Sequence, residues 1–161
     1  MSRGDEVDIA FALEVNEFNG TCSAQLLVKD IKLSDRFVQF ELLNEELYQC
    51  AKAGASELGS DYIVPQRNDC GIIYNQLLNS SRMGRDSYRI SRLLSDVNNQ
   101  NQGLNYVKIK FILNIFRELN IVNIDMIDEF SFKFHFSYPK VKVTLDKSNI
   151  LRKLKQVYKN K

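Results

Sequence analysis

The sequence has few of the residues that build metal sites and disulfides. Its 161 residues include three cysteines, one histidine, two prolines and no tryptophan. The cysteines are widely spaced and form no CxxC pair, and a lone His135 cannot complete a zinc site. We therefore expect no cofactor in this chain, and we interpret the cysteines as reduced thiols of a cytoplasmic protein.

Membrane segments and catalytic motifs are also missing. No apolar run reaches the roughly 18 to 20 residues that a membrane helix requires, so no membrane partner is expected. The charged start MSRGDEVD lacks the apolar stretch of a signal peptide. The motifs HExxH, GxGxxG, GxxxxGK[ST] and GxSxG do not occur. We predict that the chain by itself is not an enzyme and that it contains no catalytic residue.

The charge of the chain is divided unevenly between two segments. The composition is 44% hydrophobic, which is enough for a folded core, and 22 basic residues against 20 acidic ones give a net charge of +2. Residues 1–62 carry a net charge of −7, whereas residues 63–161 carry +9. This asymmetry indicates either two units with different partners, of which the basic one is suited to a phosphate backbone, or, with equal weight, two ordinary solvated surfaces.

The first segment reads as a β-hairpin followed by a helix. Apolar runs at Val7–Val15 and Ala24–Ile31 flank the dipeptide Asn19-Gly20, which is a strong hairpin signal because both residues tolerate positive φ. A hairpin alone is marginally stable, so this one needs further strands or a neighbouring domain. Helical spacing of apolar residues predicts a helix over 35–53, and the glycines after it place a boundary near 54–64.

The second segment reads as helices, then strands, then a helix. The pattern predicts helices over 67–78, 87–97 and 106–119, strands over 121–124 and 130–136, a short strand over 141–145, and a helix over 147–158 capped by Asp146. The alternating sequence FSFKFHF places Phe130, Phe132, Phe134 and Phe136 on one strand face. We predict an α+β protein, with a partial OB-like hairpin at 1–33, a helix and linker at 34–62, and a winged-helix-like C-terminal domain at 63–161.

Basic residues near the predicted helix–turn–helix are the candidate nucleic-acid contacts. Arg85, Arg89 and Arg92 would share one helix face if the helix extends back to Arg85. Arginine forks hold phosphate oxygens, and Tyr88 beside them is placed to stack on a base. An equally weighted alternative is a solubilising face with Tyr88 in the core. The candidate set is Arg82, Arg85, Tyr88, Arg89, Arg92, Lys108 and Lys110.

Two stretches of the chain resemble a known family. Gly4-Asp5 precedes a strand, the turn Asn16-Glu17-Phe18-Asn19-Gly20 follows, and Gln25-Leu26 leads to Asp30. This pattern resembles the end of the OB-fold domain of RecJ, the bacterial single-stranded-DNA-specific exonuclease, although the turn aromatic is often Trp in that family. Residues from about 63 onward look like the C-terminal domain of RecJ from some Gram-positive bacteria, through Val64-Pro65, Arg67, Ile73-Tyr74, Ile115 to Leu119, and Lys142 to Ser148.

The resemblance implies an accessory role in DNA repair and recombination. The RecJ nuclease core binds a divalent metal, Mg or Mn, through clustered Asp and His residues that this chain lacks. The chain would then be the C-terminal part of a 5′–3′ exonuclease, with its first OB strands upstream of Met1. Its expected partners are single-stranded DNA and the nuclease core.

Two alternative functions remain open. The first is a protein-interaction module that docks a repair or replication partner without contacting DNA. The second is a winged-helix transcription regulator, which would need a dimer helix and a base-reading helix that the sequence does not distinguish.

Overall fold

The computed structural model describes residues 6–98, 103–136 and 143–159. The chain divides into a first unit, Met1–Phe40, and a second unit, Glu41–Lys161. The division falls inside helix α1 (Asp35–Ala53), whose bounds are those predicted from the sequence. The second unit begins at Glu41, and α1 contributes the buried Tyr48 and Ala51 to its core.

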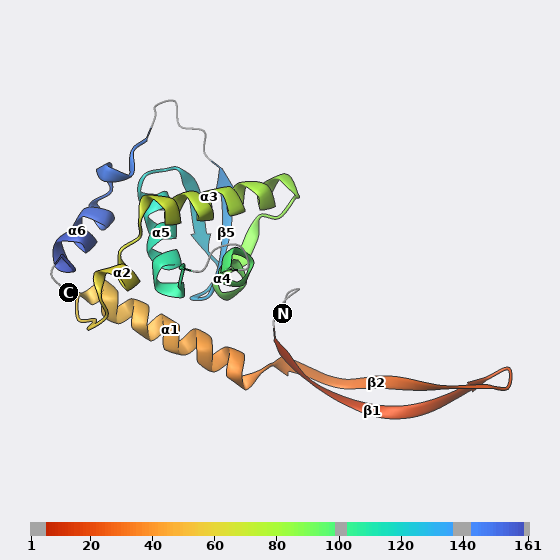
Figure 1. Ribbon diagram of the computed structural model, residues 1–161. Helices are drawn as coiled ribbons and strands as arrows, with labels where there is room; N and C mark the ends of the chain where they lie inside the picture. The colour runs from red at the N-terminus through yellow and green to blue at the C-terminus, as the bar shows by residue number, and fades with distance from the viewer. Residues whose placement is uncertain (1–5, 99–102, 137–142, 160–161) are drawn as a thin grey trace. The chain divides into compact units, whose positions relative to one another are not determined.

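The first unit is built around one long antiparallel hairpin (Figure 1). Strands β1 (Val7–Phe18) and β2 (Thr21–Leu33) are joined by Asn19 and Gly20, whose φ angles are 53° and 74°. Two central residues with positive φ match the right-handed twist of the strands, which explains the Asn-Gly dipeptide. The predicted hairpin is confirmed, and both strands run closer to the turn than expected. A register shift between Ala10 and Phe11 marks a bulge.

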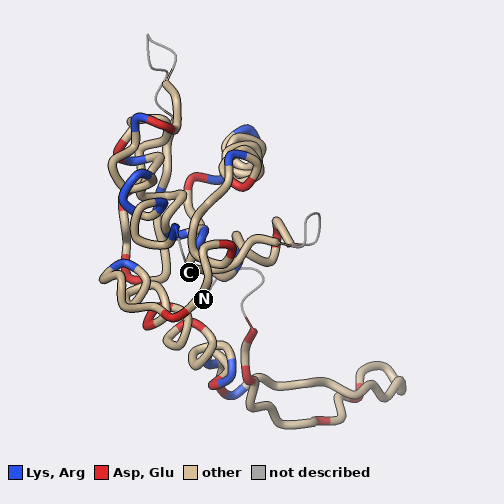
Figure 2. Tube along the Cα trace, turned by 60° about the vertical axis from the view of Figure 1, so that its left-hand side comes forward, with Lys and Arg blue, Asp and Glu red and all other residues tan. Residues whose placement is uncertain are grey.

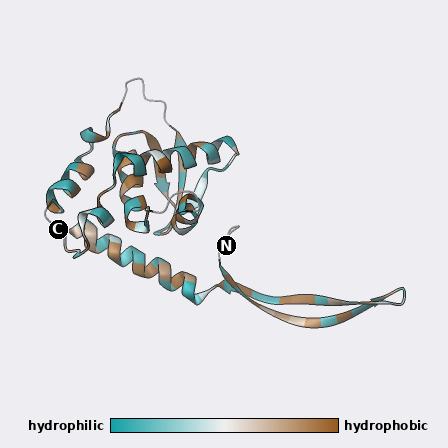
Figure 3. Ribbon diagram, viewed as in Figure 1, coloured by the Kyte–Doolittle hydropathy of each residue, from teal (hydrophilic) through white to brown (hydrophobic). Residues whose placement is uncertain are grey.

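The hairpin is apolar on one face and polar on the other. Residues that lie directly opposite each other in the ladder share a face. One face carries consecutive apolar pairs, and we call it the apolar hairpin face: Val7/Leu33, Ile9/Ile31, Phe11/Val28, Leu13/Leu26 and Val15/Ala24. The other face carries polar pairs that include Asp8/Lys32, Glu14/Gln25 and Asn16/Ser23. The same alternation is visible as brown and teal positions along the strands (Figure 3).

The second unit combines helices with a small sheet. After α1 come α2 (Ser60–Ile63), α3 (Arg67–Arg82), β3 (Ser87–Arg89), α4 (Ile90–Asn98), α5 (Tyr106–Glu118), β4 (Val122–Met126), β5 (Ser131–Phe136), the 3-10 turn η1 (Leu145–Lys147) and α6 (Asn149–Val157). The sheet is antiparallel, with strand order β3-β5-β4. The overall class is therefore α+β, as predicted.

One predicted helix begins later than expected. The sequence pattern predicts a helix over all of 87–97, but Ser87–Arg89 forms β3 and the helix starts at Ile90. The reason is tertiary, since β3 pairs with β5 through Ser87↔Lys133 and Arg89↔Ser131. Arg85, Arg89 and Arg92 consequently do not share a helix face.

Other local predictions are confirmed or corrected at the ends of elements. In β5, Phe132 and Phe134 are buried whereas Lys133 and His135 are exposed, as the alternation predicts. The last helix begins at Asn149 with Ser148 as its N-cap, which accepts a hydrogen bond from the Leu151 amide. The expected Asp146 cap is wrong, because Asp146 lies in η1. The strand expected over 141–145 falls partly outside the described residues.

Helix α5 is buried on two sides. One core packs α5 against α3, α4 and the sheet, with Tyr106, Ile109, Ile112 and Phe116 facing inward. A second core packs the opposite side of α5 against α1, α2 and α6 through Val107, Phe111 and Ile115, joined by residues such as Tyr48, Ile63, Leu154 and Tyr158. Such a helix has no open face of its own.

Within the described ranges, no helix combines the length and the apolar character needed to cross a membrane.

Candidate functional site

Most candidate nucleic-acid residues take part in ion pairs inside the second unit. Basic and acidic positions lie close together on several of its elements (Figure 2). The pairs are Arg85 with Asp96, Arg92 with Asp96, Arg89 with Glu41, Lys108 with Asp69, and Lys110 with Glu45. Three of these cations, Arg89, Lys108 and Lys110, are largely buried, whereas Arg85 and Arg92 remain partly exposed to solvent.

The pair between Arg89 and Glu41 is the most deeply buried of these. The Glu41 carboxylate, 1% exposed, accepts hydrogen bonds from Arg89 Nε at 2.8 and 3.1 Å and also from Arg89 Nη2. Ser91 Oγ donates to the same carboxylate at 2.7 Å. A buried carboxylate with this many donors is compensated for its loss of water. Its function is to hold α1 against β3 and α4.

A second buried pair lies one helical turn further along α1. Lys110 Nζ contacts Glu45 and donates to the Glu129 carbonyl at 3.0 Å, with the Tyr48 ring centroid 4.7 Å away. Burial, together with the nearby Glu45 carboxylate, raises the pKa of Tyr106 well above its usual range. The same two causes raise the pKa of Tyr48. Lys110 is thus enclosed by aromatic rings and a carboxylate.

Asp96 collects the remaining arginines. Arg92 Nε lies 2.9 Å and Arg85 Nη1 3.5 Å from this carboxylate, which also accepts from the Tyr88 hydroxyl at 3.1 Å. Tyr88 itself is 4% exposed and stacks within the core near Phe132 and Phe134. Its ring cannot stack on a base from this position, so the core alternative describes it correctly.

The other candidate residues are exposed. Arg82 ends α3 at the surface, next to Met83, which is 87% exposed. The residues Asn16, Glu17, Phe18, Asn19 and Gly20 form the exposed tip of the hairpin. Phe18 is 74% exposed, so the family-like turn displays its aromatic side chain to solvent.

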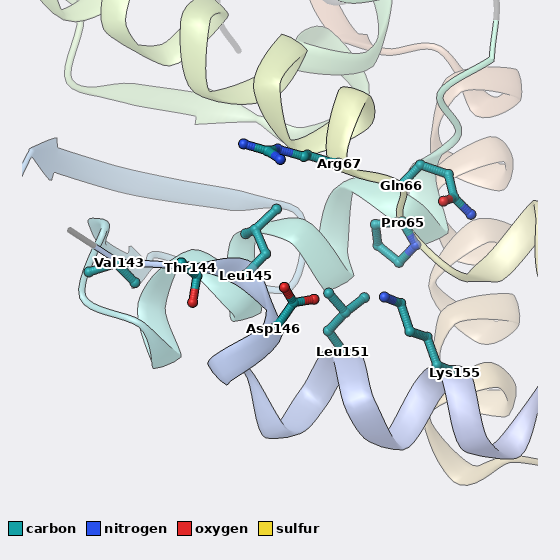
Figure 4. A pocket seen from close by; sticks show the side chains of 9 residues that line it. All are labelled: Pro65, Gln66, Arg67, Val143, Thr144, Leu145, Asp146, Leu151 and Lys155. Carbon is teal, nitrogen blue, oxygen red and sulfur yellow. The ribbon is translucent and has the colours of Figure 1, made fainter.

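Sequence reasoning did not single out the cavity between α3 and α6. Its volume is about 270 Å³, and Figure 4 shows its lining: Pro65, Gln66, Arg67, Val143, Thr144, Leu145, Asp146, Leu151 and Lys155. Arg67 of α3 and Lys155 of α6 both line this cavity. No sequence signal joins them, because 88 positions separate them along the chain.

The described residues offer no cluster of metal ligands. Across residues 6–98, 103–136 and 143–159, no group of three His, Cys, Asp or Glu side chains is arranged to hold an ion. His135 is exposed, and its Nε2 lies 2.6 Å from Asn123 Nδ2. A metal-dependent step cannot be derived from these residues.

Comparisons with protein-family models, with curated proteins and with solved structures gave no match to this chain.

Proposed function

We propose that the chain is a C-terminal accessory part of a RecJ-like single-strand-specific exonuclease, in which it positions the nuclease core. The observation that carries this proposal is the apolar hairpin face. Leu13, Val15 and Leu26 on it are 69%, 75% and 59% exposed. Contiguous exposed apolar surface of this kind marks an interaction site.

The occupant of that face is a β-sheet of the nuclease-bearing protein. Both hairpin strands have one unpaired edge within the described first unit, since its sheet contains only β1 and β2. Added strands would hydrogen-bond to those edges and close an OB-like domain over the apolar side chains. The resemblance of Gly4 to Asp30 to the end of the RecJ OB-fold supports this choice of partner.

The second unit fits a winged-helix-like module that does not read DNA bases. The order α3, β3, α4, α5, β4, β5 and the strand order β3-β5-β4 are typical of winged-helix domains. In a DNA-reading member, the helix in the position of α5 enters the major groove. Here α5 is covered on both sides, with Val107 and Ile115 fully buried in the second core. That packing supports a structural role for the unit and disfavours a transcription regulator.

A second candidate function is docking to a repair or replication protein without any DNA contact. It is favoured by the ion pairs of Arg89 and Lys110 with α1, which remove those cations from the surface. In this case the apolar hairpin face would bind a protein other than the nuclease core.

The test is association of the full chain with the nuclease-bearing part of a RecJ-like exonuclease that lacks its own C-terminal portion. The double variant Leu13→Glu/Leu26→Glu places two charges on the apolar hairpin face at one cross-strand pair. The control Ser23→Glu/Gln25→Glu adds the same two charges to the polar face. Sedimentation velocity measures complex formation, and circular dichroism checks that the second unit stays folded.

We expect wild type and the polar-face control to bind and the apolar-face variant to lose at least about tenfold in affinity, because two charges would be buried. Equal binding by both variants would overturn the proposal. A wild-type chain that ignores the nuclease-bearing part but binds a repair or replication protein through the same face would establish the second candidate instead.

A further inference from the structure

Three cations on and just after helix α6 form no ion pair with the described carboxylates. Arg152, Lys155 and Lys159 are exposed and spaced three and four residues apart, so they follow one flank of the helical turn and its continuation. In the part of the chain that the structure describes, no carboxylate forms an ion pair with any of the three. We call these residues the α6 basic stripe. It contrasts with the predicted set, in which Arg85, Arg89, Arg92, Lys108 and Lys110 are all paired with carboxylates.

The helix that presents the stripe is firmly held. Leu151, Leu154 and Tyr158 are buried on its inner side, and the Tyr158 hydroxyl donates to the Ala51 carbonyl at 2.8 Å. Burial alone would raise the pKa of Glu118, but hydrogen bonds from Ser148 and from the amides of Asn149 and Ile150 outweigh it and lower the pKa. The Glu118 carboxylate therefore accepts hydrogen bonds from the first residues of α6 and forms no ion pair with the stripe.

The stripe leads into the cavity between α3 and α6. Lys155 belongs to both, and Arg67 reaches the cavity from the first residue of α3 (Figure 4). Asp146 also lines the cavity and partly offsets these two cations. A volume of about 270 Å³ lies just below the usual range of small-molecule pockets, so it suits a phosphate group with part of its sugar.

We infer that the α6 basic stripe and this cavity form a binding site for the phosphodiester backbone of single-stranded DNA. Arg152 and Lys155 lie three residues apart on α6, a rise of roughly 4.5 Å, and Lys159 lies two residues beyond the end of the helix, so the three cations can contact successive phosphates of one strand. Aromatic side chains are absent from the described lining, so the site reads charge and not base identity. The choice of a single strand rests on the proposed function, whereas the phosphodiester site rests on the cations themselves.

The experiment is a fluorescence anisotropy titration of the full chain with a labelled oligothymidylate of roughly 20 nucleotides, repeated over a salt series. The test variant is Arg152→Glu/Lys155→Glu. The matched control is Lys29→Glu/Lys133→Glu, which makes the same change of charge at exposed lysines outside the stripe. A labelled duplex and an unlabelled polyglutamate competitor are added as separate arms.

We expect the stripe variant to bind at least about tenfold more weakly, and the affinity of the control to change by less than about threefold. The slope of log affinity against log salt concentration should be shallower by about 1.4 in the stripe variant, because each single-strand phosphate contact contributes about 0.7 to that slope. Unchanged affinity in the stripe variant would overturn the site. Competition by polyglutamate at matched charge would indicate an acidic protein as ligand and also overturn it. Preference for the duplex would overturn the single-strand assignment. None of these results depends on the hairpin. The DNA titration and the association test of the proposed function can therefore fail independently of each other.

Discussion

The two units place their apolar side chains in opposite ways. In the second unit, α5 alone contributes Ile109, Ile112 and Ile115 at 0% exposure. In the first unit, Leu13 and Val15 are mostly exposed although they sit in a regular ladder. Both units contain regular antiparallel ladders, but among the described residues the buried core clusters lie in the second unit. The second unit therefore has its own source of stability, whereas an uncovered two-stranded hairpin is only marginally stable by itself.

The largest expected effect is on the free energy of unfolding, when a buried and an exposed phenylalanine are each replaced by alanine. Phe116 is 2% exposed and Phe11 is 56% exposed. Phe116→Ala should lower the free energy of unfolding by about 3–5 kcal/mol, because it removes buried surface and leaves a cavity. Phe11→Ala should change it by less than about 0.5 kcal/mol. All seven tyrosines lie in the second unit, so their near-ultraviolet dichroism on heating reports that unit alone. A comparable loss from both substitutions would contradict the division into a cored unit and an uncovered hairpin.

A smaller effect is expected from the ion pairs of the two units. Glu41→Gln removes one charge from the buried pair with Arg89 and should cost about 3 kcal/mol, the low end for such a loss, since the amide oxygen still accepts hydrogen bonds. In the hairpin, Asp8 lies 3.9 Å from Lys32 and both are exposed. Asp8→Asn should leave urea unfolding unchanged, because water screens the pair. If Glu41→Gln were equally silent, the pair with Arg89 would not be what fastens α1.

Local signals predicted the elements whose structure is decided within a few residues. The Asn19-Gly20 turn, the α1 bounds and the Phe132/Phe134 alternation all follow from short-range pattern. The start of the helix after residue 87 could not be predicted in this way. Ser87–Arg89 is extended because β5, more than forty residues later, supplies its hydrogen-bond partners.

The candidate site was harder to predict because charge partners are a property of the fold. Arg89 meets Glu41 and Lys110 meets Glu45 across about fifty to sixty-five positions, so no pattern in the sequence distinguishes them from free cations. The spacing of Arg152, Lys155 and Lys159 was available in the sequence. What made it informative was that these cations form no ion pair within the described residues, whereas five of the seven predicted residues do.

The mildest test uses the unmodified protein and compares how fast a cysteine of each unit is labelled at a chosen pH. Cys22 in the hairpin is exposed, whereas burial and the nearby Asp69 raise the pKa of the Cys70 thiol from 9.0 to about 12. Only the thiolate reacts with iodoacetamide, so at pH 8.5 we expect fast labelling of Cys22 and of the exposed Cys50, and labelling of Cys70 only after unfolding. Because native Cys70 keeps its proton above pH 9 and the unfolded chain does not, its contribution to stability is lost as the pH rises from 9 towards 12. Mass spectrometry of labelled peptides measures the rates. Labelling of Cys70 as fast as Cys22 in the folded protein would show that the core containing Cys70 opens as readily as the hairpin, and the contrast between the units would fail.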